Sequence, residues 1–217
     1  MLRLVKFFLV LVVVAAVAAF AGYRYWESRL EAPIAIAEES LYEVQRGAGY
    51  HRVISDLTAR GVIKDEWAFR LLTRIEPESI PQLRVGEYML EPGMSGRELI
   101  ALLGSDRVVT YPLTIPEGWT FRQMRARLDA APKLENVTQG LDDSEIMALL
   151  EREGQHPEGW FFPDTYRYHK GMSDLDILRQ ALVRMERVLD EVWEGRNDDL
   201  TIESPYEALI MASLIER

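Results

Sequence analysis

The chain has 217 residues, a formal net charge of −10 and no cysteine, and this length is enough for one large or two small domains with hydrophobic cores. The acidic balance argues against a nucleic-acid-binding protein, because contacts with phosphates gain from counterion release at a basic surface. The absence of cysteine excludes a disulfide framework and a thiolate nucleophile. The spacing of the three histidines, His51, His156 and His169, matches no metal-binding motif, so we expect neither a metal ion nor another cofactor.

The amino terminus, residues 1–30, predicts a membrane-spanning helix. Arg3 and Lys6 precede an uncharged apolar run, Phe7–Tyr23. At about 1.5 Å per residue, this run and its flanks cover a hydrocarbon core of roughly 30 Å, and the preceding positive charges favour an amino end inside the cell. Three aromatic residues follow where an interfacial belt would lie: Tyr23, Tyr25 and Trp26.

A cleavable signal peptide is the alternative interpretation, because Ala19, Phe20 and Ala21 resemble a small-residue cleavage site. We favour the uncleaved anchor. Both interpretations export the rest of the chain, so the function is expected outside the cytoplasmic membrane.

A short acidic, alanine-rich tether (31–38) precedes a compact unit, 39–105, in which the pattern predicts strand, helix, helix and strand and then one more helix. The segments are a strand at Leu41–Val44, a helix that contains Val53, Ile54 and Leu57 and ends near Gly61, a helix capped by Asp65, a strand at Glu87–Leu90, and a helix from Ser95 to Leu103. This βααβ order is typical of a two-layer unit.

Residues 106–217 predict a mixed helical and strand region. A strand at Val108–Ile115 is followed by a turn and by a helix that begins at Thr120. Two further helices are predicted at Glu145–Glu153, opened by Asp143 and Ser144, and at Asp174–Trp193. The overall expectation is an α+β protein with an amino-terminal transmembrane helix and an incomplete mixed α/β domain at its carboxyl end.

The incompleteness is inferred from the last helix. Ser204 and Glu207 form a capping-box pattern before an apolar run, with Pro205 at the first helical position. No Gly, Asn or Pro marks a helix end after it. We therefore expect a fragment that is cut within or just after its terminal helix.

The stretch HPEGWFFPDTYRYHK is the densest candidate site. Glu158, Trp160, Asp164 and Tyr166 combine polar groups with flat apolar faces, as sites for sugars do. The alternative is a tight turn whose aromatic residues fill the core, which composition alone favours.

Glu216 is the second candidate. On a helix it continues a stripe of small and apolar residues formed by Leu209, Ala212 and Ser213. Partial burial would raise the pKa of its carboxyl group, as a general acid requires. A solvent-facing glutamate near a helix end is the alternative.

Three segments of the chain resemble markers of the YceG-like family of endolytic murein transglycosylases. They are TIPEGWTFRQM (114–124), EGWFFPDTY (158–166) and ASLIER (212–217), and the anchor and residues 61–103 are also similar to that family. The resemblance implies that 39–105 is a LysM-like, glycan-binding subdomain and that 106–217 is the first part of the catalytic domain. It implies that Glu216 is the catalytic residue, with no metal or cofactor.

The implied activity is cleavage of nascent peptidoglycan strands between N-acetylmuramic acid and N-acetylglucosamine, leaving a 1,6-anhydro end. The protein would be a single-pass protein of the inner membrane with its catalytic domain in the periplasm, and it would accompany peptidoglycan synthases. Two alternatives stay open: a hydrolytic muramidase in which Asp164 or Glu158 activates water, and a non-catalytic anchored glycan-binding scaffold. The 217-residue chain by itself is expected to be inactive.

Overall fold

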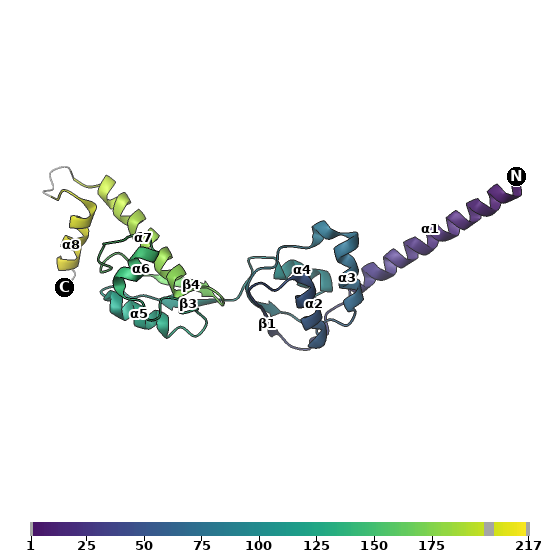
Figure 1. Ribbon diagram of the computed structural model, residues 1–217, viewed down its shortest axis with the longest axis horizontal. Helices are drawn as coiled ribbons and strands as arrows, with labels where there is room; N and C mark the ends of the chain where they lie inside the picture. Colours follow the sequence, from purple (N-terminus) through teal and green to yellow (C-terminus); the bar gives the residue numbers. More distant parts are fainter. Residues whose placement is uncertain (1, 198–201, 216–217) are drawn as a thin grey trace. The chain divides into compact units, whose positions relative to one another are not determined.

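The computed structural model describes residues 2–197 and 202–215, and the chain forms two compact units, 1–109 and 110–217. The first unit contains helix α1 (Leu2–Leu30), strand β1 (Ser40–Val44), helices α2 (Tyr50–Ala59) and α3 (Glu66–Ile75), a 3-10 turn η1 (Pro77–Ser79), strand β2 (Gly86–Leu90) and helix α4 (Gly96–Leu103) (Figure 1). The second contains β3 (Thr110–Thr114), α5 (Phe121–Asp129), α6 (Asp143–Leu149), β4 (Thr165–His169), α7 (Asp174–Glu194) and α8 (Pro205–Ile215). This content confirms the predicted α+β class with an apolar amino-terminal helix.

Helix α1 is, among the described residues, the one helix that is long and apolar enough to cross a membrane, over Leu4–Leu30. Its apolar side chains, such as those of Phe7, Leu11 and Phe20, are exposed along the amino-terminal part of the helix, which extends away from the rest of the first unit (Figure 1). A helix whose apolar surface has no protein cover needs an apolar solvent, as a bilayer provides.

The first unit buries its core between a two-stranded antiparallel sheet and three helices. Strands β1 and β2 pair in a register that places Tyr42 opposite Tyr88, and both side chains are buried. The helices contribute one apolar face each, with Val53, Ile54 and Leu57 from α2 and Phe69 and Leu72 from α3 among the buried residues. The predicted order of strand, helix, helix and strand is therefore present.

The carboxyl end of α1 belongs to this core. Trp26 and Leu30 are 2% and 0% exposed, and the indole N–H of Trp26 donates a hydrogen bond to the carbonyl oxygen of Ala68 at 2.8 Å. The sequence analysis expected Trp26 in an interfacial aromatic belt. The structure places it in the protein core instead, because the packing of α3 against α1 offers both apolar contact and an acceptor for its N–H group.

The predicted tether also contacts the first unit. The amides of Ile34 and Ala35 donate hydrogen bonds to the carbonyl oxygens of Met94 and Val62, both at 2.8 Å. Gly96 comes so close to this segment that a Cβ atom there would lie 2.9 Å from the carbonyl oxygen of Leu30 and 2.5 Å from the ring of Phe69. Hydrogen bonds and close packing thus continue from α1 into the chain that follows it.

The second unit is built on the antiparallel pair β3–β4, whose register places Leu113 opposite Tyr166. Helices α5, α6 and α7 contribute the rest of its core, including Met124, Ile146 and Leu178. On the longest helix, α7, Leu178, Leu182 and Met185 are buried, whereas Val192, near the helix end, is 63% exposed.

Two details of this unit differ from the sequence predictions. Residues 165–169 form strand β4, which the sequence analysis did not predict. Their burial alternates, with Tyr166 and Tyr168 inward and Thr165 and Arg167 outward, as in a half-buried strand. Helix α6 ends at Leu149 rather than at Glu153, because Glu151 adopts a left-handed conformation with φ 62° that a helix cannot continue through.

Four helices begin with a complete capping box, in which the N-cap side chain and the side chain three residues later each accept an amide N–H of the other residue. The pairs are Ser95 and Glu98 for α4, Thr120 and Gln123 for α5, Asp142 and Glu145 for α6, and Ser173 and Asp176 for α7. These pairs fix where each helix begins independently of distant contacts.

Asp174 is a fully buried carboxylate at the start of α7. It accepts hydrogen bonds from the amides of Val137 at 3.0 Å, Thr138 at 3.1 Å and Leu175 at 2.8 Å, and from the hydroxyl of Thr138. A carboxylate with this many donors compensates for its loss of water. It connects the loop that precedes α6 to α7.

The substitution Asp174→Asn is expected to lower the free energy of unfolding by about 2–3 kcal/mol, because an amide offers one acceptor oxygen and turns an NH2 group toward the remaining donors. Urea unfolding of the detergent-solubilised chain, followed by tryptophan fluorescence, measures the loss. Asp190→Asn, at an exposed position of the same helix, is the control and should change stability by less than about 0.5 kcal/mol. Equal effects of the two substitutions would contradict this role.

Candidate functional site

A groove of about 560 Å³ in the second unit is the candidate site. Three segments that are distant in sequence line it: the loop after β3, the loop before β4, and helix α8. Representative lining residues are Trp119 and Thr120 from the first segment, Glu158 and Phe161 from the second, and Tyr206 and Ser213 from the third. Met124 of α5 and Met185 of α7 also line it, so the groove is made by two chain connections and α8, over α5 and α7.

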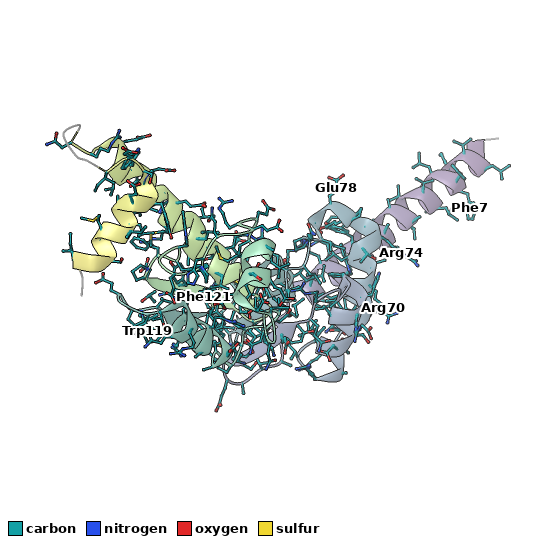
Figure 2. All side chains as sticks on the ribbon, turned by 60° about the vertical axis from the view of Figure 1, so that its left-hand side comes forward. Phe7, Arg70, Arg74, Glu78, Trp119 and Phe121 are labelled. Atoms are coloured by element: carbon teal, nitrogen blue, oxygen red, sulfur yellow. The ribbon has the colours of Figure 1, made fainter. Side chains whose placement is uncertain are left out.

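The first wall is a turn between β3 and α5. It starts where the amide of Ile115 donates to the carbonyl oxygen of Asp164 at 2.9 Å, and it reverses at Gly118, whose φ of 72° suits glycine. Trp119 follows, 37% exposed although it is the largest side chain type, and Thr120 then caps α5. Figure 2 shows Trp119 and Phe121 at this start of the helix. Because Trp119 stands directly between the turn glycine and the helix N-cap, no helix or strand covers its indole, which lies at the surface of the groove.

The second wall is joined to the first by a carboxylate. The Oε2 atom of Glu158 accepts a hydrogen bond from the amide of Phe121 at 3.0 Å, which is one of the amides without a partner inside α5. The rings of Phe121 and Phe161 also stack, with centroids 5.0 Å apart. A polar link at the surface and an aromatic stack beneath it thus hold the two loops together.

Helix α8 forms the third wall through two contacts with the same loop. The rings of Trp160 and Tyr206 stack with centroids 5.5 Å apart and an angle of 8° between their planes. Gly159 lies under the helix, and a Cβ atom there would be 3.3 Å from Cδ2 of Leu209. Trp160 therefore supports the groove from behind Tyr206 rather than lining it.

Two of the residues predicted for a sugar site lie elsewhere. Asp164 forms an ion pair with Arg184 of α7, and its Oδ1 accepts the amide of Thr165 at 2.6 Å. Tyr166 is buried, its hydroxyl donates to the carbonyl oxygen of Phe162 at 2.5 Å, and burial raises the pKa of that hydroxyl to about 12. Neither residue lines the groove.

Glu216, the predicted catalytic residue, lies outside the described residues. Of the described residues of the segment 212–217, Ala212 and Ser213 line the groove, whereas Ile215 is 81% exposed and does not. The ASxxE segment thus reaches the groove with its first two residues.

Trp119 is a groove residue that the sequence analysis did not select. The signal was present in the pattern Pro-x-Gly-Trp-Thr, where a tryptophan stands between a turn glycine and a helix N-cap. Such a position offers the side chain no helix or strand face to pack with, so exposure was the expected outcome.

The groove offers flat aromatic faces, hydroxyl groups and few charges. Trp119 and Tyr206 are 37% and 42% exposed, and Thr120 and Ser213 add hydroxyl groups. Glu158 is the one carboxylate among the described lining residues. Groups of three or more side chains that could hold a metal ion are absent from the part of the chain that the structure describes. Stacking faces with a few polar groups suit an uncharged ring-shaped ligand such as a sugar.

These features define an α+β protein with an apolar amino-terminal helix and an aromatic-walled groove. The model of the YceG-like family matches residues 42–217, so the chain belongs to the YceG-like family. The crystal structure of the YceG-like protein lmo1499 from Listeria monocytogenes is 22% identical, with a TM-score of 0.33 over 73% of this chain and 58% of that one. The chain therefore spans 58% of the length of the Listeria protein. A search of curated proteins gave no match.

Gly159 allows a test of the contact between the second wall and α8. Gly159→Ala and Gly154→Ala both place an alanine at positive φ, 84° and 78°, but only at Gly159 does the new Cβ contact a neighbour, Leu209. We expect a backbone cost of about 1–2 kcal/mol in both variants. Only Gly159→Ala should also displace α8 and alter the fluorescence of Trp160, which stacks on Tyr206.

Stability is measured by urea unfolding and the position of α8 by the emission spectrum and acrylamide quenching of tryptophan. Identical spectra for the two variants would mean that Gly159 is required by its backbone conformation alone.

Proposed function

We propose that this protein is a membrane-anchored lytic transglycosylase that cleaves peptidoglycan glycan strands in the groove of the second unit. The observation that carries the proposal is the convergence of three segments, 114–124, 158–166 and 212–217, each of which contributes described residues to the lining of one groove. These are the segments that resemble the markers of the YceG-like family, to which the chain belongs. Membership associates the chain with lytic transglycosylase activity.

Trp119 and Tyr206 are the proposed platforms for the sugar rings. Their exposed faces can receive the CH face of a pyranose ring, as aromatic walls do in ligand sites. Thr120 and Ser213 offer hydroxyl groups to the hydroxyl and acetamido groups of the strand. The proposed subsites follow the groove between the first wall and α8.

Glu216 is the proposed acid and base. The sequence analysis places it in one stripe with Leu209, Ala212 and Ser213, and these three line the groove. In the proposed reaction the protonated carboxyl group donates its proton to the glycosidic oxygen, and an oxocarbenium-like sugar develops. The carboxylate then takes the proton of the muramic acid O6 hydroxyl as this oxygen bonds to C1. The product carries a 1,6-anhydro end, and no water is consumed.

One carboxylate is sufficient for this reaction because the attacking hydroxyl group is part of the substrate. Hydrolysis would need a second carboxylate to activate water. Of the two candidates, Asp164 is paired with Arg184 and Glu158 binds the amide of Phe121. These contacts favour the transglycosylase over the muramidase.

The proposed location is the inner membrane, with α1 as a single-pass anchor and both units in the periplasm. Helix α1 continues without a break through Ala19, Phe20 and Ala21 to Leu30, and its end is part of the core of the first unit. This integration favours the anchor over a cleaved signal peptide. Anchoring raises the effective concentration of the enzyme at newly made strands, and peptidoglycan synthases are the proposed neighbours. Residues 39–105 of the first unit are the proposed LysM-like glycan-binding module.

Glu216→Gln, made in the natural protein at its encoded length, should abolish cleavage of purified peptidoglycan, because the amide can neither donate nor accept the required proton. Mass spectrometry of the digest should show mainly 1,6-anhydro ends with the unsubstituted protein. Glu207→Gln, an exposed substitution in the same helix, is the control and should retain activity.

A majority of hydrated reducing ends would assign the muramidase instead. Binding to glycan strands with no cleavage by the unsubstituted protein would assign the scaffold.

Trp119→Ala should weaken binding of glycan strands by roughly threefold to tenfold, the equivalent of about 0.5–1.5 kcal/mol for one aromatic stacking contact. The matched control is Trp193→Ala, which removes an indole that is absent from the groove lining and that packs under Arg196. Cosedimentation with peptidoglycan measures both. If the two variants cosediment with peptidoglycan to the same extent, Trp119 is not part of the proposed subsites.

A further inference from the structure

The core of the first unit lies close to the proposed bilayer. The distance between them follows from the sequence of α1 alone. The apolar run ends at Tyr23, and Trp26, three residues later, is buried in the core of the unit. The headgroup layer on one side of a bilayer is roughly 5–7 Å thick, and at about 1.5 Å per residue the three residues from Tyr23 to Trp26 rise about 4.5 Å. The core of the first unit therefore begins within the headgroup layer.

Two exposed aromatic rings lie at this level. Tyr25 and Trp67 are 54% and 45% exposed, and their rings stack with centroids 6.2 Å apart and 13° between their planes. Tyr25 is on α1 and Trp67 is on α3, so the stack fixes the start of α3 at the same height above the apolar run. The guanidinium group of Arg29 lies 4.9 Å from the centre of the Tyr25 ring and pairs with Asp65 at 3.5 Å.

The outer face of α3 continues this surface. Trp67, Arg70 and Arg74 follow one another at helical spacing and are exposed, opposite the buried Ala68, Phe69 and Leu72. Figure 2 shows Arg70 and Arg74 projecting from the side of the first unit on which α1 extends away. Glu66 pairs with Arg70 at 2.8 Å, so the face is not strongly charged. Aromatic rings with flanking arginines are the side chains that favour the membrane–water interface.

We propose that Tyr25 and the outer face of α3, formed by Trp67, Arg70 and Arg74, are a membrane-docking surface that rests in the headgroup layer of the bilayer that α1 spans. The partner is the lipid bilayer itself. The proposal depends on the proposed membrane anchoring and does not depend on catalysis. This surface holds the first unit in one orientation on the membrane, because α1 enters the core of the unit without a linker and a second element, α3, contacts the lipid.

Quenching of tryptophan fluorescence by brominated lipids tests the proposal. The full chain is reconstituted into phosphatidylcholine and phosphatidylglycerol vesicles that contain lipids brominated near the headgroup end of the acyl chain. Trp67 is one of five tryptophans, so the unsubstituted chain is compared with Trp67→Phe and with Trp119→Phe. Trp119 is similarly exposed and belongs to the second unit, which makes it the matched control.

The expected result is equal quenching in the unsubstituted chain and in Trp119→Phe and a smaller quenched component in Trp67→Phe, because Trp26 of α1 lies at the same level and keeps part of it. Vesicle flotation is measured on the same samples, because it reports on the anchor separately. Chains that float with the vesicles but show equal quenching in all three forms would overturn the docking surface and leave the anchor in place. Chains that do not float would overturn the anchor and the docking surface together.

Discussion

The groove depends on the join between two of its walls, where the carboxylate of Glu158 accepts a hydrogen bond from the amide of Phe121 and the rings of Phe121 and Phe161 stack. This bond joins the loop that enters α5 to the loop that leads into β4, and these loops are 37 residues apart in sequence. An unpaired amide at a helix start needs an acceptor, and a carboxylate is the acceptor that the positive end of the helix favours most. The contacts of Trp160 and Gly159 with α8 then attach the third wall to a pair of loops that are already fixed.

The sequence predicted well those elements whose signals are local. Ser95 and Thr120 begin helices as N-caps, and capping depends on residues three positions apart. Strand β4 was missed because three aromatic residues and a proline before it concealed the alternation of Tyr166 and Tyr168. Trp26 was misplaced because its burial depends on Ala68, a residue 42 positions away. Long-range contacts of this kind leave no periodic pattern in the sequence.

In the candidate site, too, local sequence signals identified the segment, and long-range contacts decided the role of each residue. The segment 158–166 was selected for its composition, and the structure uses its residues differently. Glu158 lines the groove, Trp160 supports it from behind Tyr206, and Asp164 and Tyr166 bind α7 and the backbone of Phe162. The core interpretation holds for Phe161 and Tyr166, which are buried, and the ligand-site interpretation stays a prediction. Composition identifies such a stretch, but only the partners of each side chain assign its role.

The capping boxes differ in the groups that they use. The boxes of α4, α6 and α7 each contain at least one carboxylate, whereas the box of α5 consists of a threonine and a glutamine. The start of α5 receives its carboxylate from outside the helix, because Glu158 of the loop before β4 accepts the amide of Phe121. The contact that completes the cap of α5 is therefore also the contact that joins two walls of the groove, so a change in that wall reaches the start of the helix.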